Sequence, residues 1–138
     1  MTLIQASITI DASIDKVWDI VSDIDNETKY WKGIKQIRNI SKVGNKITRE
    51  IVIAFRDSKC MQEVTLFPKE KIEAVFTKGI IHGTKTLNLN STDKGVNLDA
   101  VWDIKLSGMM SMFTGMIKRH IKNGTEQALQ SLKQEAER

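Results

Sequence analysis

The sequence predicts an α+β fold in which a curved, seven-stranded antiparallel sheet wraps around one long C-terminal helix. Alternating apolar and polar residues fill most of the chain, which is typical of half-buried strands. The segment Ser111–Glu137 instead lacks proline and repeats apolar residues at helical spacing. Such a sheet has one face to bury, and this helix is the only large element that can cover it. Residues 1–138 are therefore expected to form a single domain.

The first part of the chain predicts a strand and two short helices. Leu3–Asp11 alternates and predicts a half-buried strand. Ser13 can cap a short helix, and Asp23–Lys29 indicates a second short helix or turn. The apolar positions of the capped helix are Ile14, Val17, Trp18 and Val21.

The middle of the chain predicts a meander of six further strands. Gly44-Asn45 is a typical two-residue hairpin turn, and Pro68 begins another turn. The expected strands are Ile34–Val43, Lys46–Phe55, Lys59–Phe67, Lys71–Thr77, Ile80–Asn90 and Val96–Leu106.

The last helix should lie over the concave face of the sheet. It would be about 40 Å long but only about 10 Å across, too narrow to fill the concavity, so a cavity is expected between them. Its apolar face comprises Phe113, Ile117, Ile121, Gly124, Ala128 and Leu132. We interpret the part from Gly124 onward as structural, and the part from Met109 to His120 as the wall of the cavity.

Hairpin pairing predicts which strand residues face that cavity. The expected pairs are Phe55–Cys60, Ile53–Gln62, Ile51–Val64, Arg49–Leu66, Val64–Ala74, Gln62–Phe76, Leu89–Val96, Leu87–Leu98, Lys85–Ala100 and Gly83–Trp102. The Gly44-Asn45 turn would also place Arg38 inside, opposite Ile51. It would place Ile37 outside, paired with Val52 beside Ala54, as an apolar residue group that could contact a partner.

Arg49, Gln62 and Lys85 are polar exceptions on the expected inner face. An interior cation without a carboxylate partner is costly, so one hypothesis is that these cations bind an anionic head group. The alternative is that they reach water at the rim, or that the register differs.

Other candidate site residues lie near the start of the last helix. Met109, Met110, Met112 and Met116 suit a surface that repacks around apolar ligands, although ordinary core filling is the alternative. His120 could contact a ligand or act as a base; a structural histidine is the alternative, as it is for His82. Neither these histidines nor Cys60 has metal-ligand spacing, so no metal and no cofactor are expected.

Two stretches resemble a known superfamily. They are IDASIDKVWDIVSDIDNETKYWKGI and GTKTLNLNSTDKGVNLDAVWDIKLSG. With the element order, they resemble the START/Bet v 1-like (SRPBCC) superfamily, and within it the polyketide cyclase/dehydrase and lipid-transport group. Two departures are the adjacency of Tyr30 and Trp31, and Gly33 where a proline often stands. The matching positions are Ala12, Val17, Trp18, Asp23, Tyr30 and Trp31.

The resemblance implies a helix-grip fold with a cavity for a hydrophobic ligand, and it does not imply catalysis. We expect binding, transport or presentation of a hydrophobic or amphipathic small molecule or lipid. The expected ligand-binding residues are Trp31, Arg49, Ile51, Ile53, Phe55, Gln62, Val64, Phe76, Lys85, Leu87, Leu98, Ala100, Trp102, Met109, Met112, Phe113, Met116, Ile117 and His120.

Two alternatives stay open. One is a polyketide aromatase/cyclase or dehydratase, in which His120, Arg49 or Tyr30 moves protons or polarises carbonyls. The other is a partner protein resembling quinone chaperones. The net charge of +4 fits either solubility or a negatively charged partner, and no nucleic-acid motif is present. Without an apolar span or signal pattern, we expect a cytoplasmic monomer or weak homodimer, with transient membrane contact left open.

Overall fold

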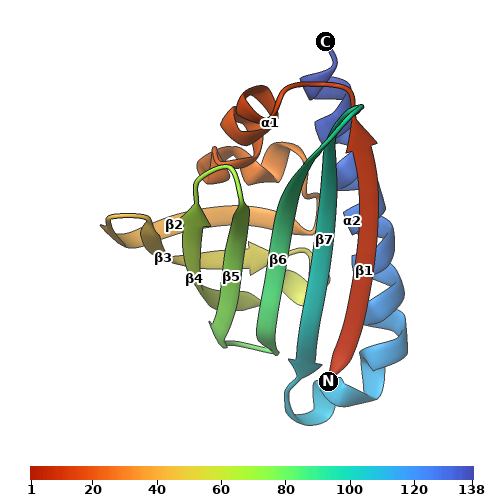
Figure 1. Ribbon diagram of the computed structural model, residues 1–138. Coiled ribbons are helices and arrows are strands. Elements are labelled where there is room, and N and C mark those ends of the chain that lie inside the picture. Colours follow the sequence, from red (N-terminus) through yellow and green to blue (C-terminus); the bar gives the residue numbers. More distant parts are fainter.

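Seven strands form one antiparallel sheet in the order β1-β7-β6-β5-β4-β3-β2 (Figure 1). The computed structural model describes residues 1–138. All strands except β1 follow chain order as a meander, and β1 pairs with the edge of β7. The strands are β1 (Thr2–Ile10), β2 (Ile34–Val43), β3 (Lys46–Ile53), β4 (Lys59–Phe67), β5 (Lys71–Lys78), β6 (Ile81–Thr92) and β7 (Gly95–Leu106).

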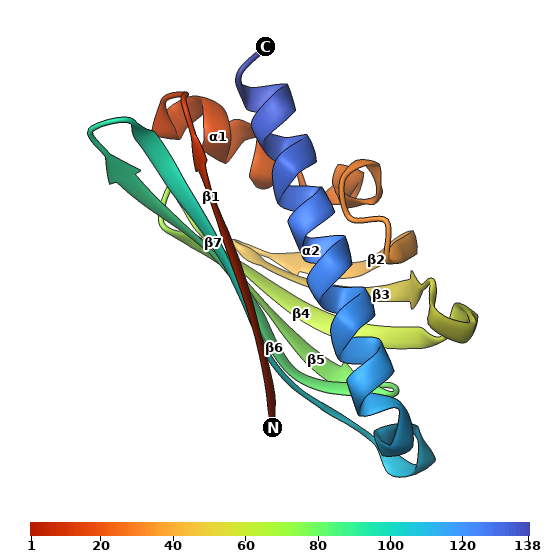
Figure 2. The ribbon, with the colours of Figure 1, turned by 90° about the vertical axis from the view of Figure 1, so that its right-hand side faces the viewer.

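One long helix, α2 (Thr114–Ala136), crosses the concave face of this sheet and packs along β1 (Figure 2). The short helix α1 (Ile14–Val21) begins after Ser13, whose side chain accepts a hydrogen bond of 3.2 Å from the Lys16 N–H. Three 3₁₀ segments complete the chain: η1 (Ile24–Lys29), η2 (Phe55–Asp57) and η3 (Gly108–Phe113). The predicted helix-grip architecture is confirmed.

The two halves of α2 meet different surroundings. Its second half carries Ala128, Leu129 and Leu132 into a buried cluster with residues of α1 and the sheet, such as Val17 and Leu98. Its first half places Ile117 in a second cluster, with apolar residues from β3, β5 and β7. The predicted apolar face is thus partly correct, but Thr125, Leu129 and Ala136 are also buried. The α-helix also begins at Thr114, because Gly108–Phe113 forms a 3₁₀ turn.

Two predicted registers are wrong by an even number of residues. Ile51 lies opposite Cys60 and Arg49 opposite Gln62, because β3 ends at Ile53 and Phe55 belongs to η2. In the last hairpin, a tight turn after Thr92 places Leu89 opposite Leu98, Leu87 opposite Ala100, Lys85 opposite Trp102 and Gly83 opposite Ile104. An even shift leaves each side chain on its predicted face. The β4–β5 pairs Val64–Ala74 and Gln62–Phe76 are confirmed.

A β-bulge in β2 reverses two predictions of facing. The register of β2 against β3 shifts between Asn39 and Ser41, which moves the residues before it to the other face. Arg38 therefore lies opposite Glu50 and not inside the cavity, and its guanidinium forms an exposed ion pair with Glu50 at 3.4 Å. Ile37 lies opposite Ile51 and packs against the core, so it is not part of an outward apolar group.

Candidate functional site

A cavity of about 690 Å³ lies between the first half of α2 and the sheet. Aromatic rings form one end of it: the Trp31 and Trp102 centroids are 6.4 Å apart, and Phe76 stacks on Trp102 at 6.0 Å. Trp102 is held in place because its indole N–H donates a hydrogen bond of 3.1 Å to the Thr125 hydroxyl on α2. The wall is mostly apolar, which suits a small molecule with a hydrophobic body.

Ten of the predicted ligand-binding residues line this cavity. They are Trp31, Ile51, Ile53, Phe55, Gln62, Phe76, Lys85, Trp102, Ile117 and His120. Arg49, Val64 and Leu87 instead line a small hollow of about 30 Å³, which shares Trp31 and Lys85 with the larger cavity. Leu98 and Ala100 are completely buried in the core. That these lining residues contact a ligand stays a prediction.

The methionines do not form the predicted wall. Met109 is 82% exposed and Met112 is 78% exposed, while Phe113 and Met116 are more than one third exposed. The four residues lie outside the cavity because the η3 turn carries the chain past the end of the sheet before α2 begins. Only Met110 packs against the buried residues.

Arg49 is buried but fully partnered. Its guanidinium donates to the Gln62 side-chain oxygen at 2.9 Å and to the Ile24 carbonyl at 3.2 Å. It also forms an ion pair with the Glu27 carboxylate. The expectation of an interior cation without a carboxylate partner is therefore wrong for Arg49.

Lys85 shares the same carboxylate and reaches the cavity. Its ammonium nitrogen lies 3.7 Å from Glu27 and 3.2 Å from the centroid of the Trp31 ring. Burial lowers the pKa of Lys85 from 10.5 to about 8; Glu27 opposes this shift, and the positive charge of Arg49 adds to it. Arg49 and Lys85 thus share the single carboxylate of Glu27. These three side chains together carry one uncompensated positive charge at neutral pH.

Glu27 is the residue of the charged group that the sequence pattern did not predict. Pairing between strands can reveal only partners within the sheet, whereas Glu27 comes from η1, above the sheet face. The sequence did predict a short helix or turn at Asp23–Lys29, the segment that contains Glu27. The alternation of the strands does not specify which residues of that helix face inward.

Apart from Lys85, the basic residues of the wall are two cations and one histidine. Lys32, Arg56 and His120 line the cavity, and no aspartate or glutamate does. Gly124 also lines it, and a Cβ there would meet no atom within 4 Å, so this glycine leaves volume open. His82 lies outside the lining. Burial raises the pKa of the Cys60 thiol, which keeps it protonated and unreactive.

Replacement of Glu27 should destabilise the protein, because two buried cations would lose their carboxylate partner. We expect Glu27→Gln to lower the free energy of unfolding by about 3–5 kcal/mol, because it removes the only carboxylate partner of Arg49 and Lys85. Denaturant unfolding measures the loss. The matched control is Glu50→Gln, which breaks the ion pair with the exposed Arg38 at the surface and should cost less than about 1 kcal/mol. Equal losses would contradict the role assigned to Glu27.

Lys85 should make stability depend on alkaline pH. Its pKa is lower in the folded state, so folding is penalised while the amine is protonated in both states, below about pH 8. The penalty is relieved as pH rises from about 8 toward 10.5, the ordinary lysine value. Relative to Lys85→Met, the wild-type free energy of unfolding should therefore rise by about 2 kcal/mol between pH 7 and pH 10. A constant or falling difference, measured by denaturant unfolding at each pH, would contradict this.

Comparisons with known proteins bear on the family and on the fold. Residues 1–137 match the family described as polyketide cyclase / dehydrase and lipid transport. No curated protein matches the chain. Its fold is similar to that of TTHA0849 from Thermus thermophilus, with a TM-score of 0.82, 12% identity and coverage of 96% of this chain and 95% of that one.

Two other solved structures share the fold. The Zhui aromatase/cyclase from Streptomyces sp. R1128 has a TM-score of 0.81 at 14% identity, covering 99% of this chain and 94% of that one. A START superfamily protein from Mycobacterium smegmatis has a TM-score of 0.68 at 15% identity, covering 94% and 98%. With its helix-grip fold and its match over nearly the whole sequence, the chain belongs to the polyketide cyclase/dehydrase and lipid-transport family.

Proposed function

We propose that the protein binds an amphipathic small molecule whose apolar body fills the cavity and whose anionic group lies against Lys85. The observation that carries this proposal is a largely apolar cavity whose wall includes three basic residues, Lys32, Arg56 and Lys85, and no acidic residue. Its volume of about 690 Å³ falls within the range that holds a lipid chain or fused-ring compound. Binding in this form serves transport, sequestration or presentation of the ligand.

Lys85 is better suited than Arg49 to receive the anionic group. The Arg49 guanidinium already donates to Gln62, Ile24 and Glu27 and lies outside the larger cavity. Lys85 lines the cavity, and its partners are a shared carboxylate, Glu27, and the faces of the Trp31 and Trp102 rings, so its ammonium group has no carboxylate of its own. An incoming carboxylate or phosphate would balance the uncompensated positive charge of Arg49 and Lys85 beside an ammonium group that is itself buried.

The wall composition favours binding over catalysis. A cyclase or dehydratase would need a base that removes a proton, and His120 is the wall residue suited to that task. His120 lies on an exposed part of α2, and no carboxylate lines the cavity to orient its ring. The cyclase role therefore remains the second candidate, supported by the family and not by a catalytic pair.

A side chain added at Gly124 should occupy the ligand space. Gly124→Leu is expected to weaken binding of the neutral fluorophore N-phenyl-1-naphthylamine by about tenfold or more, because Leu would project into the cavity. Gly115→Leu is the matched control: Gly115 also lies in α2 with no atom within 4 Å of an added Cβ, but it does not line the cavity. Fluorescence titration measures both. Equal affinities for the two variants would contradict the assigned binding site.

The role of Lys85 is tested with a matched pair of ligands. Lys85→Met should weaken binding of laurate by about tenfold or more, because a charge-assisted contact is lost, and change dodecanol binding by less than about twofold. Displacement of N-phenyl-1-naphthylamine gives both affinities. Equal loss for the acid and the alcohol would rule out an anion-binding role, and an unchanged laurate affinity would rule out Lys85 as the contact.

A further inference from the structure

The start of the last helix exposes a group of large apolar side chains that the cavity does not use. We call Met109, Met112, Phe113 and Met116 the Met patch; their exposed fractions are 82%, 78%, 38% and 37%. The segment is anchored where it leaves the sheet, because the Ser107 N–H donates to the Ile80 carbonyl at 2.9 Å. The segment that carries the Met patch lies at one end of the molecule, at the lower right of Figure 2, where the chain enters α2.

The Met patch adjoins a part of the cavity wall that includes an exposed residue, Arg56. The Phe113 ring lies 6.4 Å from that of Phe55, and Arg56 lies 3.9 Å from the sulfur of Met110. Phe55 and Arg56 both line the cavity, and Ile117, one turn along α2, lines it from the other side. A surface that contacts the Met patch would thus lie next to this part of the cavity wall.

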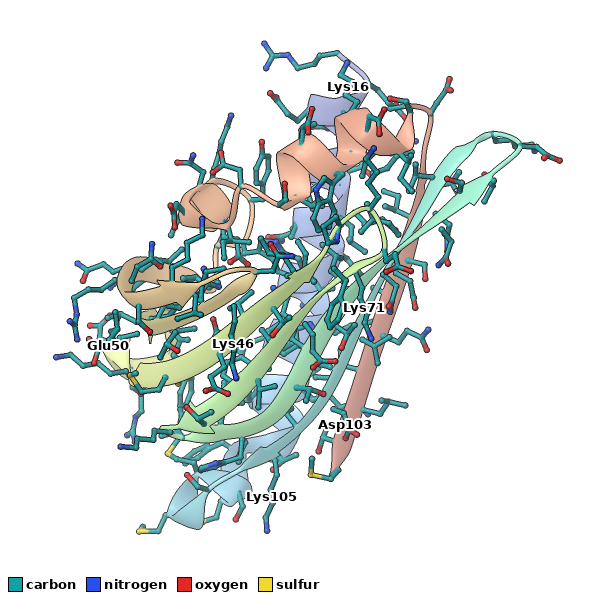
Figure 3. All side chains as sticks on the ribbon, turned by 60° about the vertical axis from the view of Figure 1, so that its left-hand side comes forward. Lys16, Lys46, Glu50, Lys71, Asp103 and Lys105 are labelled. Atoms are coloured by element: carbon teal, nitrogen blue, oxygen red, sulfur yellow. The ribbon has the colours of Figure 1, made fainter.

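Positive charge surrounds the same segment. Residues 104–125 contain Lys105, Lys118, Arg119 and Lys122 but no aspartate or glutamate. Lys118 and Arg119 are exposed on α2, and Lys105 projects near the lower end of the sheet in Figure 3. Exposed apolar side chains with flanking cations match the apolar and anionic layers of a membrane surface.

We propose that the Met patch docks the protein onto a bilayer surface that contains anionic lipid, so that the ligand passes directly between bilayer and cavity. This inference rests on the proposed function and narrows its ligand to an amphiphile that resides in membranes. A bilayer fits the Met patch better than a protein partner does. The patch is made mainly of unbranched, flexible methionines, which need no complementary shape to enter a lipid interface. No helix of the chain is long and apolar enough to cross a membrane.

Vesicle co-sedimentation tests the docking. Wild-type protein should bind vesicles of phosphatidylcholine with phosphatidylglycerol about tenfold more tightly than vesicles of phosphatidylcholine alone, and raised salt should weaken the binding. The double variant Met109→Ser/Met112→Ser should lose about tenfold or more of this affinity. The control is Val43→Ser: Val43 is 77% exposed but lies at the end of β2, and its replacement should change vesicle affinity by less than about twofold.

The same variants separate this inference from the proposed function. Met109→Ser/Met112→Ser should bind N-phenyl-1-naphthylamine as the wild type does, whereas Gly124→Leu should bind vesicles normally and lose the fluorophore. Absence of wild-type binding to the anionic vesicles would overturn the docking proposal and favour a protein partner for the Met patch. Vesicle binding that survives the double variant would also overturn it, because the lysines and arginines alone would then account for the attraction. Neither result would alter the cavity assignment.

Discussion

The carboxylate of Glu27 connects three parts of the structure that the rest of the site depends on. It brings η1 to Arg49 on β3 and to Lys85 on β6, and thereby fixes the chain that leads into Trp31. The Trp31 ring then covers Lys85 and meets Trp102 edge to face. A buried charge group of this kind contributes little net stability, but its loss is costly because the remaining charges are left unpaired. Its value here is to keep one cation at the cavity wall.

The cavity exists because the two halves of α2 pack differently. Apolar side chains of its second half fill the space over the sheet. This half of the helix therefore fixes the position of α2 on the sheet. Along its first half, the lack of a side chain at Gly124 and the curvature of the sheet leave volume unfilled. A glycine inside a helix lowers stability by up to about 1 kcal/mol relative to alanine. At Gly124 this loss is accompanied by open volume in the cavity.

Sequence patterns predicted the fold and the faces of most strands, because both depend on periodicities that local residues set. The register errors around Phe55 and Gly95 were even, so each side chain there stayed on its predicted face of the sheet. The single extra residue near Ile40 instead moved Arg38 and Ile37 to the faces opposite those predicted. Glu27 could not be predicted, since its partners are distant in the sequence. The exposed methionines were misplaced because helical spacing was extended backward into a 3₁₀ turn.

Native mass spectrometry of the protein purified from its source, followed by extraction of what is bound, tests directly whether the cavity holds an anionic amphiphile. We expect one amphiphile per chain carrying a single anionic group, retained by the wild type and by Gly115→Leu and lost from Gly124→Leu. A wild-type protein that is consistently empty, or a neutral ligand retained equally by Gly124→Leu, would contradict this expectation.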